Sequence, residues 1–171
     1  MDIKELKAAD LTHHSNEFAD LLIDCVAGGA SIGFLPPLAI PDALAYWHGV
    51  AQAIETGHRV LLAATEEGRL TGTVQLDLPG MPNGRHRAEV MKLLVHTRAR
   101  RQGIGAKLMD RVEISAREHG RSLLVLDTKT GDTAELLYRK LGWHCAGTIP
   151  GYALDTRGIP HSTTIFYRRI D

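Results

Sequence analysis

The chain has 171 residues, of which 44% are hydrophobic and 23% charged, so it can bury one substantial core but is too short for two full domains. Twenty basic and twenty acidic residues give a formal net charge of zero, which offers no support for a nucleic-acid partner. We expect a single cytoplasmic domain over residues 1–171 without membrane span or metal site, because long apolar runs, a signal-like start and cysteine or histidine ligand spacing are all missing.

Helical periodicity predicts two helices before the first long strand. Between residues 12 and 26 apolar side chains recur every three or four positions, and Gly28–Gly29 end that pattern. Pro41 can open a second amphipathic helix, which closes at Gly57. The loop at residues 29–37 between them is apolar and rich in glycine. It either packs against the helices or borders a substrate pocket, and the sequence leaves both interpretations open.

Three strands are expected next. Residues 58–65 and 70–78 read as an antiparallel hairpin around a Glu-Glu-Gly turn. After a loop rich in proline and glycine, residues 87–95 form the third strand. Strict alternation along this strand would place four side chains on one face: Glu89, Met91, Leu93 and Val95.

The segment Arg100–Ala106, with the sequence Arg-Arg-Gln-Gly-Ile-Gly-Ala, is the most informative part of the chain. Its two glycines let the backbone come close to a ligand. The amphipathic helix that follows, ending at Gly120, offers unpaired N–H groups and the positive end of its dipole. Two arginines add positive charge. These features predict a cradle for the pyrophosphate of a phosphorylated cofactor.

Two better-known glycine loops do not fit this segment. A dinucleotide fingerprint needs a third glycine, and Leu108 stands in its place. A Walker A loop needs Gly-Lys-Ser or Gly-Lys-Thr, whereas Gly105 is followed by Ala106 and Lys107. On the loop alone, a glycine turn that merely starts a helix stays open as the alternative.

The last third of the chain continues the alternation of strands and helices. Residues 122–127 form a nearly continuous apolar strand, which is typical of parallel pairs buried on both faces. The run Asp132–Glu135 resembles a capping box that starts a short helix, and Gly142 ends it. Residues 143–148 and 162–169 complete two more strands. The order of elements predicts a mixed-sheet α/β domain.

The chain resembles the GNAT N-acetyltransferase family at several points. The glycine loop follows that family's Arg-x-x-Gly-x-Gly pattern after a strand ending in Leu-Leu-Val, and the segments from Glu89 to Trp143 follow its central order. The resemblance implies a twisted, mostly antiparallel mixed sheet with a central splayed parallel strand pair, flanked by helices. It also implies acetyl-CoA as co-substrate, direct transfer of acetyl to an amine, and no metal.

The resemblance assigns the contacts with acetyl-CoA. It implies that the backbone of Leu93, Leu94 and Val95 pairs with the pantetheine arm, close to a bulge near Val95. Gly131 stands where many family members carry an asparagine, which leaves a further contact with that arm in doubt. The pyrophosphate would be held by the glycine loop, namely Arg100, Arg101, Gln102, Gly103, Ile104, Gly105 and Ala106.

The resemblance also assigns catalytic roles. Glu89 and Asp127 match acids that remove a proton from the amine, and Tyr138 matches a tyrosine that protonates the departing thiol. Taken without the resemblance, Glu89 is an ordinary strand acid, Asp127 a turn acid and Tyr138 a core tyrosine. With it, we expect all three to be functional.

Within the family, the likeness extends furthest to members that acetylate tabtoxin-like lactams. We therefore expect the acceptor to be a small-molecule primary amine, such as a toxin, an antibiotic or an amino-acid-like compound. Ser31, Phe34 and Tyr152 are the expected substrate contacts. A protein or peptide N-acetyltransferase and a non-catalytic CoA-binding regulator are the alternatives, and the protein is expected to be a monomer or a homodimer.

Overall fold

A computed structural model describes residues 1–155 and 157–171, and its centre is a seven-stranded sheet with the order β1-β2-β3-β4-β5-β7-β6. Strands β4 and β5 run parallel, and the other neighbouring pairs run antiparallel. The predicted mixed sheet with a central parallel pair is therefore confirmed. The strands are β1 (Asp2–Glu5), β2 (Arg59–Glu66), β3 (Arg69–Asp77), β4 (Arg87–Val95), β5 (Leu123–Lys129), β6 (His144–Leu154) and β7 (Pro160–Arg169).

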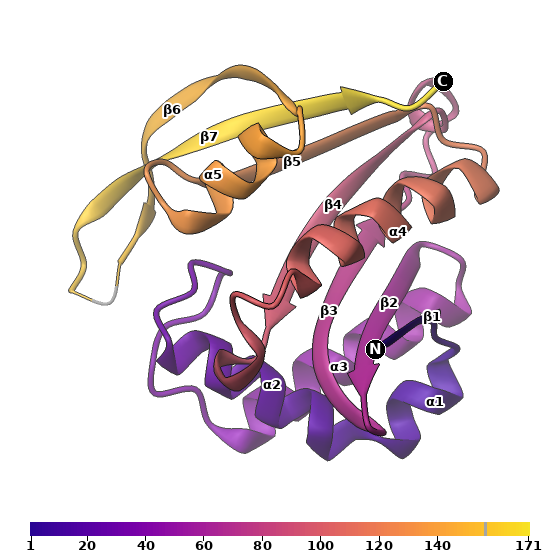
Figure 1. The fold of residues 1–171 in the computed structure, drawn as a ribbon, viewed down its shortest axis with the longest axis vertical. Helices are drawn as coiled ribbons and strands as arrows, with labels where there is room; N and C mark the ends of the chain where they lie inside the picture. Colours follow the sequence, from indigo (N-terminus) through magenta and orange to yellow (C-terminus); the bar gives the residue numbers. More distant parts are fainter. Residues whose placement is uncertain (156) are drawn as a thin grey trace.

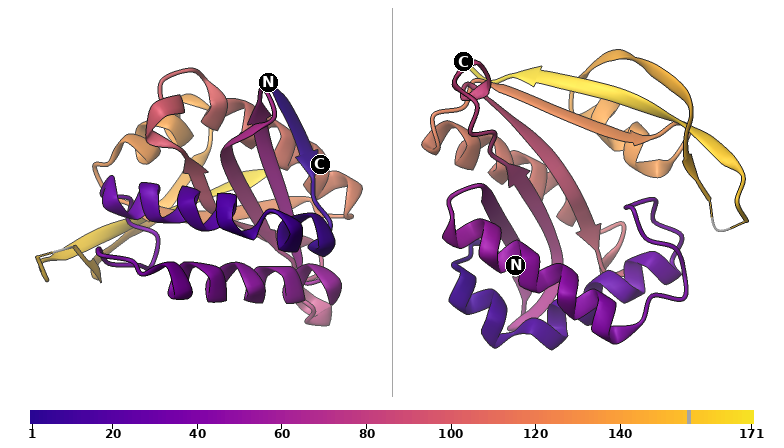
Figure 2. Two further views of the ribbon diagram at one scale, coloured as in Figure 1. Left: turned by 90° about the horizontal axis from the view of Figure 1, so that it is seen from below. Right: turned by 180° about the vertical axis from the view of Figure 1, so that it is seen from behind.

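Helices cover both faces of the sheet (Figure 1). On one face lie α1 (Ala8–His13), α2 (Ser15–Ala27) and α3 (Ile40–Glu55), which run side by side in Figure 2. On the other face α4 (Ile104–Glu118) crosses β2, β3 and β4, and α5 (Thr133–Lys140) packs beside β5. Short 3-10 turns lie at Pro82–Gly84 and Thr97–Ala99. Among the helices in the described ranges, none is long and apolar enough to cross a membrane.

Two apolar cores sandwich the sheet because alternate strand residues point to opposite faces. On the α4 side, Leu108 and Val112 pack with Val90 and other strand residues, and this core continues to Tyr138 and Phe166. On the opposite side, α2 and α3 supply the second core, which includes Phe18, Leu22, Trp47, Leu61 and Leu94. The strand that carries the predicted site, β4, contributes to both cores.

Strands β4 and β5 diverge soon after they pair. Their register covers Arg87 with Leu123, Ala88 with Leu124, and Glu89 with Val125. Beyond these residues the two strands separate, and Figures 1 and 2 show the sheet opening like a V from that point. The splayed pair implied by the resemblance is thus present in the fold.

A bulge in β4 accompanies this divergence. Lys92 has a φ angle of 51°, and the register against β3 shifts between Thr73 and Gln75, so two residues of β4 stand opposite one of β3. The resemblance placed the bulge near Val95, and the structure corrects its position to Lys92.

The bulge also overturns the expectation that Glu89, Met91, Leu93 and Val95 share one face. Ala88 and Val90 belong to the core on the α4 side, so Glu89 and Met91 face the opposite way. After the inserted residue, Leu93 and Val95 pack on the α4 side. One extra residue reverses the alternation, and this reversal sends Glu89 and Leu93 to different faces of the sheet.

Some element boundaries differ from the predicted ones. Strand β1 was not predicted because its four residues are mostly polar, and His14 divides the expected first helix into α1 and α2. Strand β6 runs on to Leu154 rather than ending at residue 148, with irregular register against β7 at positions 145/147 and 149/153. The longer β6 brings Tyr152 and Ala153 to the cavity that Glu89 and Asp127 also line.

Candidate active site

The glycine loop forms an open end of helix α4. Arg101 and Gly103 have φ angles of 64° and 80°, which lie in the left-handed region. The helix begins at Ile104, and none of the side chains in the described part of the chain caps it. Its first internal bond runs from the N–H of Lys107 to the carbonyl oxygen of Gly103. The preceding N–H groups of Ile104, Gly105 and Ala106 are therefore free for an anion.

Gly105 packs closely against neighbouring side chains at this helix end. A Cβ at this position would lie 3.3 Å from Leu137 Cδ2 of α5 and 3.9 Å from side-chain atoms of Leu93 and Val95. The loop, α5 and the end of β4 thus approach one another closely here. Uncapped N–H groups at the start of a helix fit a pyrophosphate.

The predicted loop residues play different parts in this cradle. Arg101, Gln102 and Gly103 are exposed, whereas Ile104 is buried in the core and offers only its backbone N–H. Arg100 turns toward the protein, where its Nε donates to the carbonyl oxygen of Val95 at 3.2 Å. Arg100 therefore supports the loop from behind.

The end of α2 is tied to the segment just before the cradle. The Asp24 carboxylate accepts hydrogen bonds from the backbone N–H and the hydroxyl of Thr97, each at 2.7 Å. The Cys25 thiol donates to the carbonyl oxygen of Val95 at 3.6 Å. Burial raises the pKa of this thiol, which makes it a packed side chain rather than an activated nucleophile.

At the end of β4 the N–H of Val95 is open on one side, whereas its carbonyl oxygen already accepts from Arg100 and Cys25. The N–H of His96 donates to the carbonyl oxygen of Thr71 in β3, so alternate residues of β4 direct their backbone groups toward β3. Leu94 follows this direction, whereas Val95 directs its N–H away from β3, to the side from which β5 has departed. Leu93 lines the adjoining cavity. Val95 is therefore better placed than Leu94 to pair with an extended ligand.

Glu89, Asp127 and Tyr138 line one cavity of about 380 Å³. Glu89 lies on β4 at the last residue paired with β5, and Asp127 lies near the end of β5. The two acids share a face of the sheet because Glu89 is paired with Val125, two residues before Asp127. Tyr138 reaches the cavity from α5. The structure thus brings together the three side chains that the sequence predicted as catalytic.

The environment of Glu89 favours its protonated form. Burial raises the pKa of its carboxyl, and the negative charges of Asp127 and Asp77 raise it further, while Arg59 and Arg87 oppose the change. A carboxylate whose pKa lies closer to neutrality is a better general base at physiological pH.

Asp127 is held in place by a neighbouring strand. The hydroxyl of Thr163 in β7 lies 2.7 Å from Asp127 Oδ2 and 2.9 Å from the carbonyl oxygen of Thr128. Thr163 is itself buried, so this contact restricts the rotamers available to the acid.

Tyr138 combines a buried ring with a position at the cavity. The residue is 6% exposed, and its ring packs against Trp143 and Phe166 at centroid distances of 6.0 and 6.1 Å. Burial, together with the negative charge of Asp127, raises the pKa of the Tyr138 hydroxyl well above its usual value. The hydroxyl therefore stays protonated at neutral pH and can act as a proton donor.

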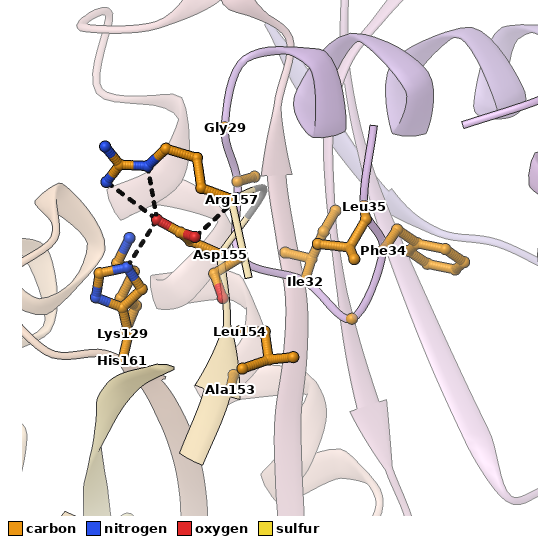
Figure 3. Close-up of a pocket in the computed structure, with 13 residues that line it drawn as sticks. Gly29, Ile32, Phe34, Leu35, Lys129, Ala153, Leu154, Asp155, Arg157 and His161 are labelled. Atoms are coloured by element: carbon orange, nitrogen blue, oxygen red, sulfur yellow. Dashed lines mark hydrogen bonds and ion pairs between the residues drawn. The ribbon is translucent and has the colours of Figure 1, made fainter. Parts of the chain in front are cut away.

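The expected substrate residues border this cavity and an adjoining one of about 430 Å³. Ser31 lines both cavities, Tyr152 the first and Phe34 the second. The Phe34 ring also packs edge-to-face against Tyr46 of α3, and in Figure 3 it points away from Asp155. Both interpretations of the loop at residues 29–37 hold, since it packs on the helices and borders a pocket.

Several residues of the site were not predicted from the sequence. Lys92 donates from Nζ to the carbonyl oxygen of Ile32 at 2.7 Å and so ties the β4 bulge to the loop at residues 29–37. Burial lowers the pKa of Lys92, against the raising effect of Asp127. A lysine in an alternating strand gives no sequence signal for such a position, because its left-handed backbone is set by the bulge.

A charged cluster forms the far wall of the second cavity (Figure 3). Asp155 Oδ2 lies 3.1 Å from His161 Nε2 and 3.2 Å from Arg157 Nη2. Backbone N–H donation from Ile159, followed by the His161 contact, holds the pKa of Asp155 well below its usual range. In the part of the chain that the structure describes, no three His, Cys, Asp or Glu side chains gather as metal ligands would.

Comparison with known proteins places this arrangement in a family. The family described as "Acetyltransferase (GNAT) domain" matches residues 41–160. An uncharacterized N-acetyltransferase of Azospirillum brasilense is 31% identical over 129 residues, which cover 74% of this chain and 73% of that protein. The chain belongs to the GNAT acetyltransferase family. The family resemblance seen in the glycine loop is thereby confirmed.

Solved structures share the GNAT fold over nearly the whole chain. An N-acetyltransferase from Staphylococcus aureus Mu50 matches with a TM-score of 0.81 at 19% identity, covering 99% of this chain and 98% of that one. A putative acetyltransferase from Salmonella typhimurium, solved with acetyl-CoA, matches with a TM-score of 0.80 at 21% identity, covering 100% and 94%. At these identities the likeness shows the fold and leaves the acceptor to be inferred from this GNAT protein's own site.

Proposed function

We propose that this GNAT protein transfers an acetyl group from acetyl-CoA directly to a primary amine of a small molecule. The proposal rests on one observation: Glu89, Asp127 and Tyr138 line the same cavity, where β4 and β5 diverge. The acetyltransferase domain spans residues 1–171 in this proposal, since strands from both ends of the chain belong to one sheet.

The cradle at the start of α4 would hold the pyrophosphate of acetyl-CoA through the N–H groups of Gly103–Ala106, with positive charge from Arg101. Leu93 and the outward-facing backbone of Val95 would contact the pantetheine arm. Leu94 directs its backbone groups to β3, so we do not include it among the contacts with the pantetheine arm. When bound, acetyl-CoA supplies the acetyl group as a thioester and leaves as a thiol.

Glu89 is the proposed general base. A primary amine is mostly protonated at neutral pH and must lose a proton before it can attack. The raised pKa of Glu89 suits it to accept that proton, directly or through water. Asp127, held by Thr163 on the same face of the sheet, favours the cationic amine as it enters.

Tyr138 is the proposed general acid. Its hydroxyl stays protonated because burial and Asp127 raise its pKa, and it donates a proton to the departing sulfur. The ring is fixed by Trp143 and Phe166, so the side chain loses little conformational freedom when its hydroxyl donates to the departing sulfur.

The cavities favour a small acceptor. Their volumes of about 380 and 430 Å³ suit a compact amine, and the loop containing Ser31 and Phe34 closes one side of them. Tyr152 stands at the other side. We propose that the acceptor is a toxin, an antibiotic or an amino-acid-like amine, including lactams of the tabtoxin type, and that acetylation inactivates it.

A thiol-release assay with acetyl-CoA tests this proposal. Amino acids, polyamines, aminoglycosides, tabtoxin-like lactams and peptides are offered as acceptors, and products are identified by mass spectrometry. We expect release of CoA with a small amine and formation of its N-acetyl product. Release with peptides alone would indicate a peptide N-acetyltransferase. Tight binding of CoA without release with any amine would contradict catalysis and indicate a CoA-binding regulator.

A further inference from the structure

A row of charged side chains crosses the sheet on the face that carries Glu89. Arg59 of β2 is paired with Asp77 of β3, and Asp77 is paired with Glu89 of β4. Asp127 lies on the same face of β5, two residues beyond the partner of Glu89. Three carboxylates therefore occupy neighbouring strands, with the Arg59 cation at one end of the row. Like charges on cross-strand neighbours repel one another.

Arg59 is held by several fixed contacts. Its Nη2 donates to Asp77 Oδ1 at 2.9 Å, and its Nη1 lies 2.7 Å from Gln75 Oε1 and 3.0 Å from Met91 Sδ. The Gln75 amide donates in turn to the Tyr46 hydroxyl at 2.9 Å, which anchors the group to α3. The Arg59 side chain is only 18% exposed. A guanidinium fixed in this way is a permanent, oriented positive charge.

We propose that Arg59 is a positioning residue for acetyl transfer, which pairs with Asp77 and so leaves Glu89 as the carboxylate that serves the cavity. The catalytic consequence rests on the proposed role of Glu89 as base. Without the Arg59 cation, Asp77 would lose its ion-pair partner, and of the two cations that oppose its effect on Glu89 only Arg87 would remain. Glu89 would then keep its proton to a higher pH and fail to accept one from the amine.

The balance of charge around Glu89 supports this assignment. After burial, the groups that raise its pKa are Asp127 and Asp77, and the groups that lower it are Arg59 and Arg87. Lys92, on the same strand, feels the charge of Glu89 in turn. Besides these groups, the titratable side chains that line the cavity are Lys129, Asp132, Tyr138, Tyr152 and His161.

Titration of the Glu89 carboxyl by NMR tests the inference without needing activity. The protein carries isotope-labelled glutamate side chains, and loss of a signal in Glu89→Gln assigns the resonance. We expect the titration midpoint to rise in Arg59→Met, to fall in Asp77→Asn, and to lie between these two in the double variant. Arg59→Lys keeps the charge and should stay near the wild-type midpoint. Arg69→Met removes an exposed charge at the far end of β3 and should leave it unchanged.

An unchanged midpoint in a folded Arg59→Met protein would overturn the inference. If circular dichroism shows that Arg59→Met does not fold, the Asp77→Asn variant provides the test instead. A Glu89 titration midpoint that does not fall in Asp77→Asn would then overturn the inference. The acid limb of kcat/KM, measured in the same variants, should move with the NMR midpoint. If the NMR midpoint moves and the acid limb of kcat/KM does not, Arg59 sets the ionisation of Glu89 but Glu89 is not the base. In that case the inference about Arg59 stands and the proposed role of Glu89 is wrong.

Discussion

Tyr138 shows how a single side chain serves both the core and the proposed chemistry. Its ring packs against Trp143 and Phe166, so removal of the hydroxyl leaves the packing intact. We expect Tyr138→Phe to lower kcat by roughly 10²-fold or more, with binding of CoA unchanged, because a general acid contributes about that much to the rate. Steady-state kinetics and CoA titration check this, and unchanged turnover would remove Tyr138 from the mechanism.

The pH dependence of the rate in variants of Glu89 and Asp127 tests whether either acid acts as a base. A base is needed while the amine is protonated, and it acts only when it is itself ionised. We therefore expect Glu89→Gln and Asp127→Asn to slow kcat/KM most at neutral and mildly acidic pH. The deficit should shrink as the pH approaches the pKa of the amine, where the acceptor deprotonates unaided. pH–rate profiles check this, and a deficit that is the same at every pH in both variants would rule out a base role for either acid.

At the scale of elements, the start of α4 is the proposed cradle for acetyl-CoA. We expect Gly105→Ala to raise the KM for acetyl-CoA, roughly tenfold or more, because its Cβ would crowd Leu137 at the cradle. Gly49→Ala is a matched control, since Gly49 lies in α3 and its Cβ would meet nothing within 4 Å. The control should gain about 0.5–1 kcal/mol of helix stability without a change in KM. Equal KM values for both variants would contradict the assignment of the cradle.

Some features of the helices and strands could be predicted from the sequence, and others could not. The uncapped start of α4 was predictable because the spacing of Gly103 and Gly105 before an amphipathic helix directly expresses its backbone geometry, whereas its role as a pyrophosphate cradle stays a prediction. The bulge at Lys92 was not predictable, because the residues that follow it, Leu93, Leu94 and Val95, are all apolar and show no alternation. Arg59 was missed because its importance comes from cross-strand pairing, which depends on a register that the sequence does not state.

At the scale of the whole molecule, the divergence of β4 and β5 separates the sheet into two arms joined at the base of the V (Figure 1). The catalytic candidates come from both arms, with Glu89 on one and Asp127 and Tyr138 on the other. The family and the mixed sheet could be predicted because they depend on short motifs and on the order of the elements, and the catalytic roles of Glu89, Asp127 and Tyr138 stay predictions. The shape of the acceptor cavities could not, because it arises where a helix-connecting loop and the β6–β7 hairpin meet.

A ligand that contacts both arms should stabilise the whole fold. We expect CoA at about 100 times its Kd to stabilise the protein by roughly 2.7 kcal/mol, which corresponds to a rise in Tm of roughly 5–10 °C for a chain of this size. Thermal unfolding followed by circular dichroism measures the shift. Adenosine, which lacks the pyrophosphate and the pantetheine arm, is the control and should give little change. Equal effects of CoA and adenosine would argue against the cradle.

The central claim is direct acetyl transfer from acetyl-CoA to a small amine at the cavity between Glu89, Asp127 and Tyr138. A mass-spectrometric time course of protein, CoA and amine in one reaction mixture tests it most directly. The account predicts that N-acetylated amine and free CoA appear in equal amounts while the protein mass stays unchanged. A protein species acetylated at Cys25 or Cys145 that forms first and then passes its acetyl group to the amine would contradict it.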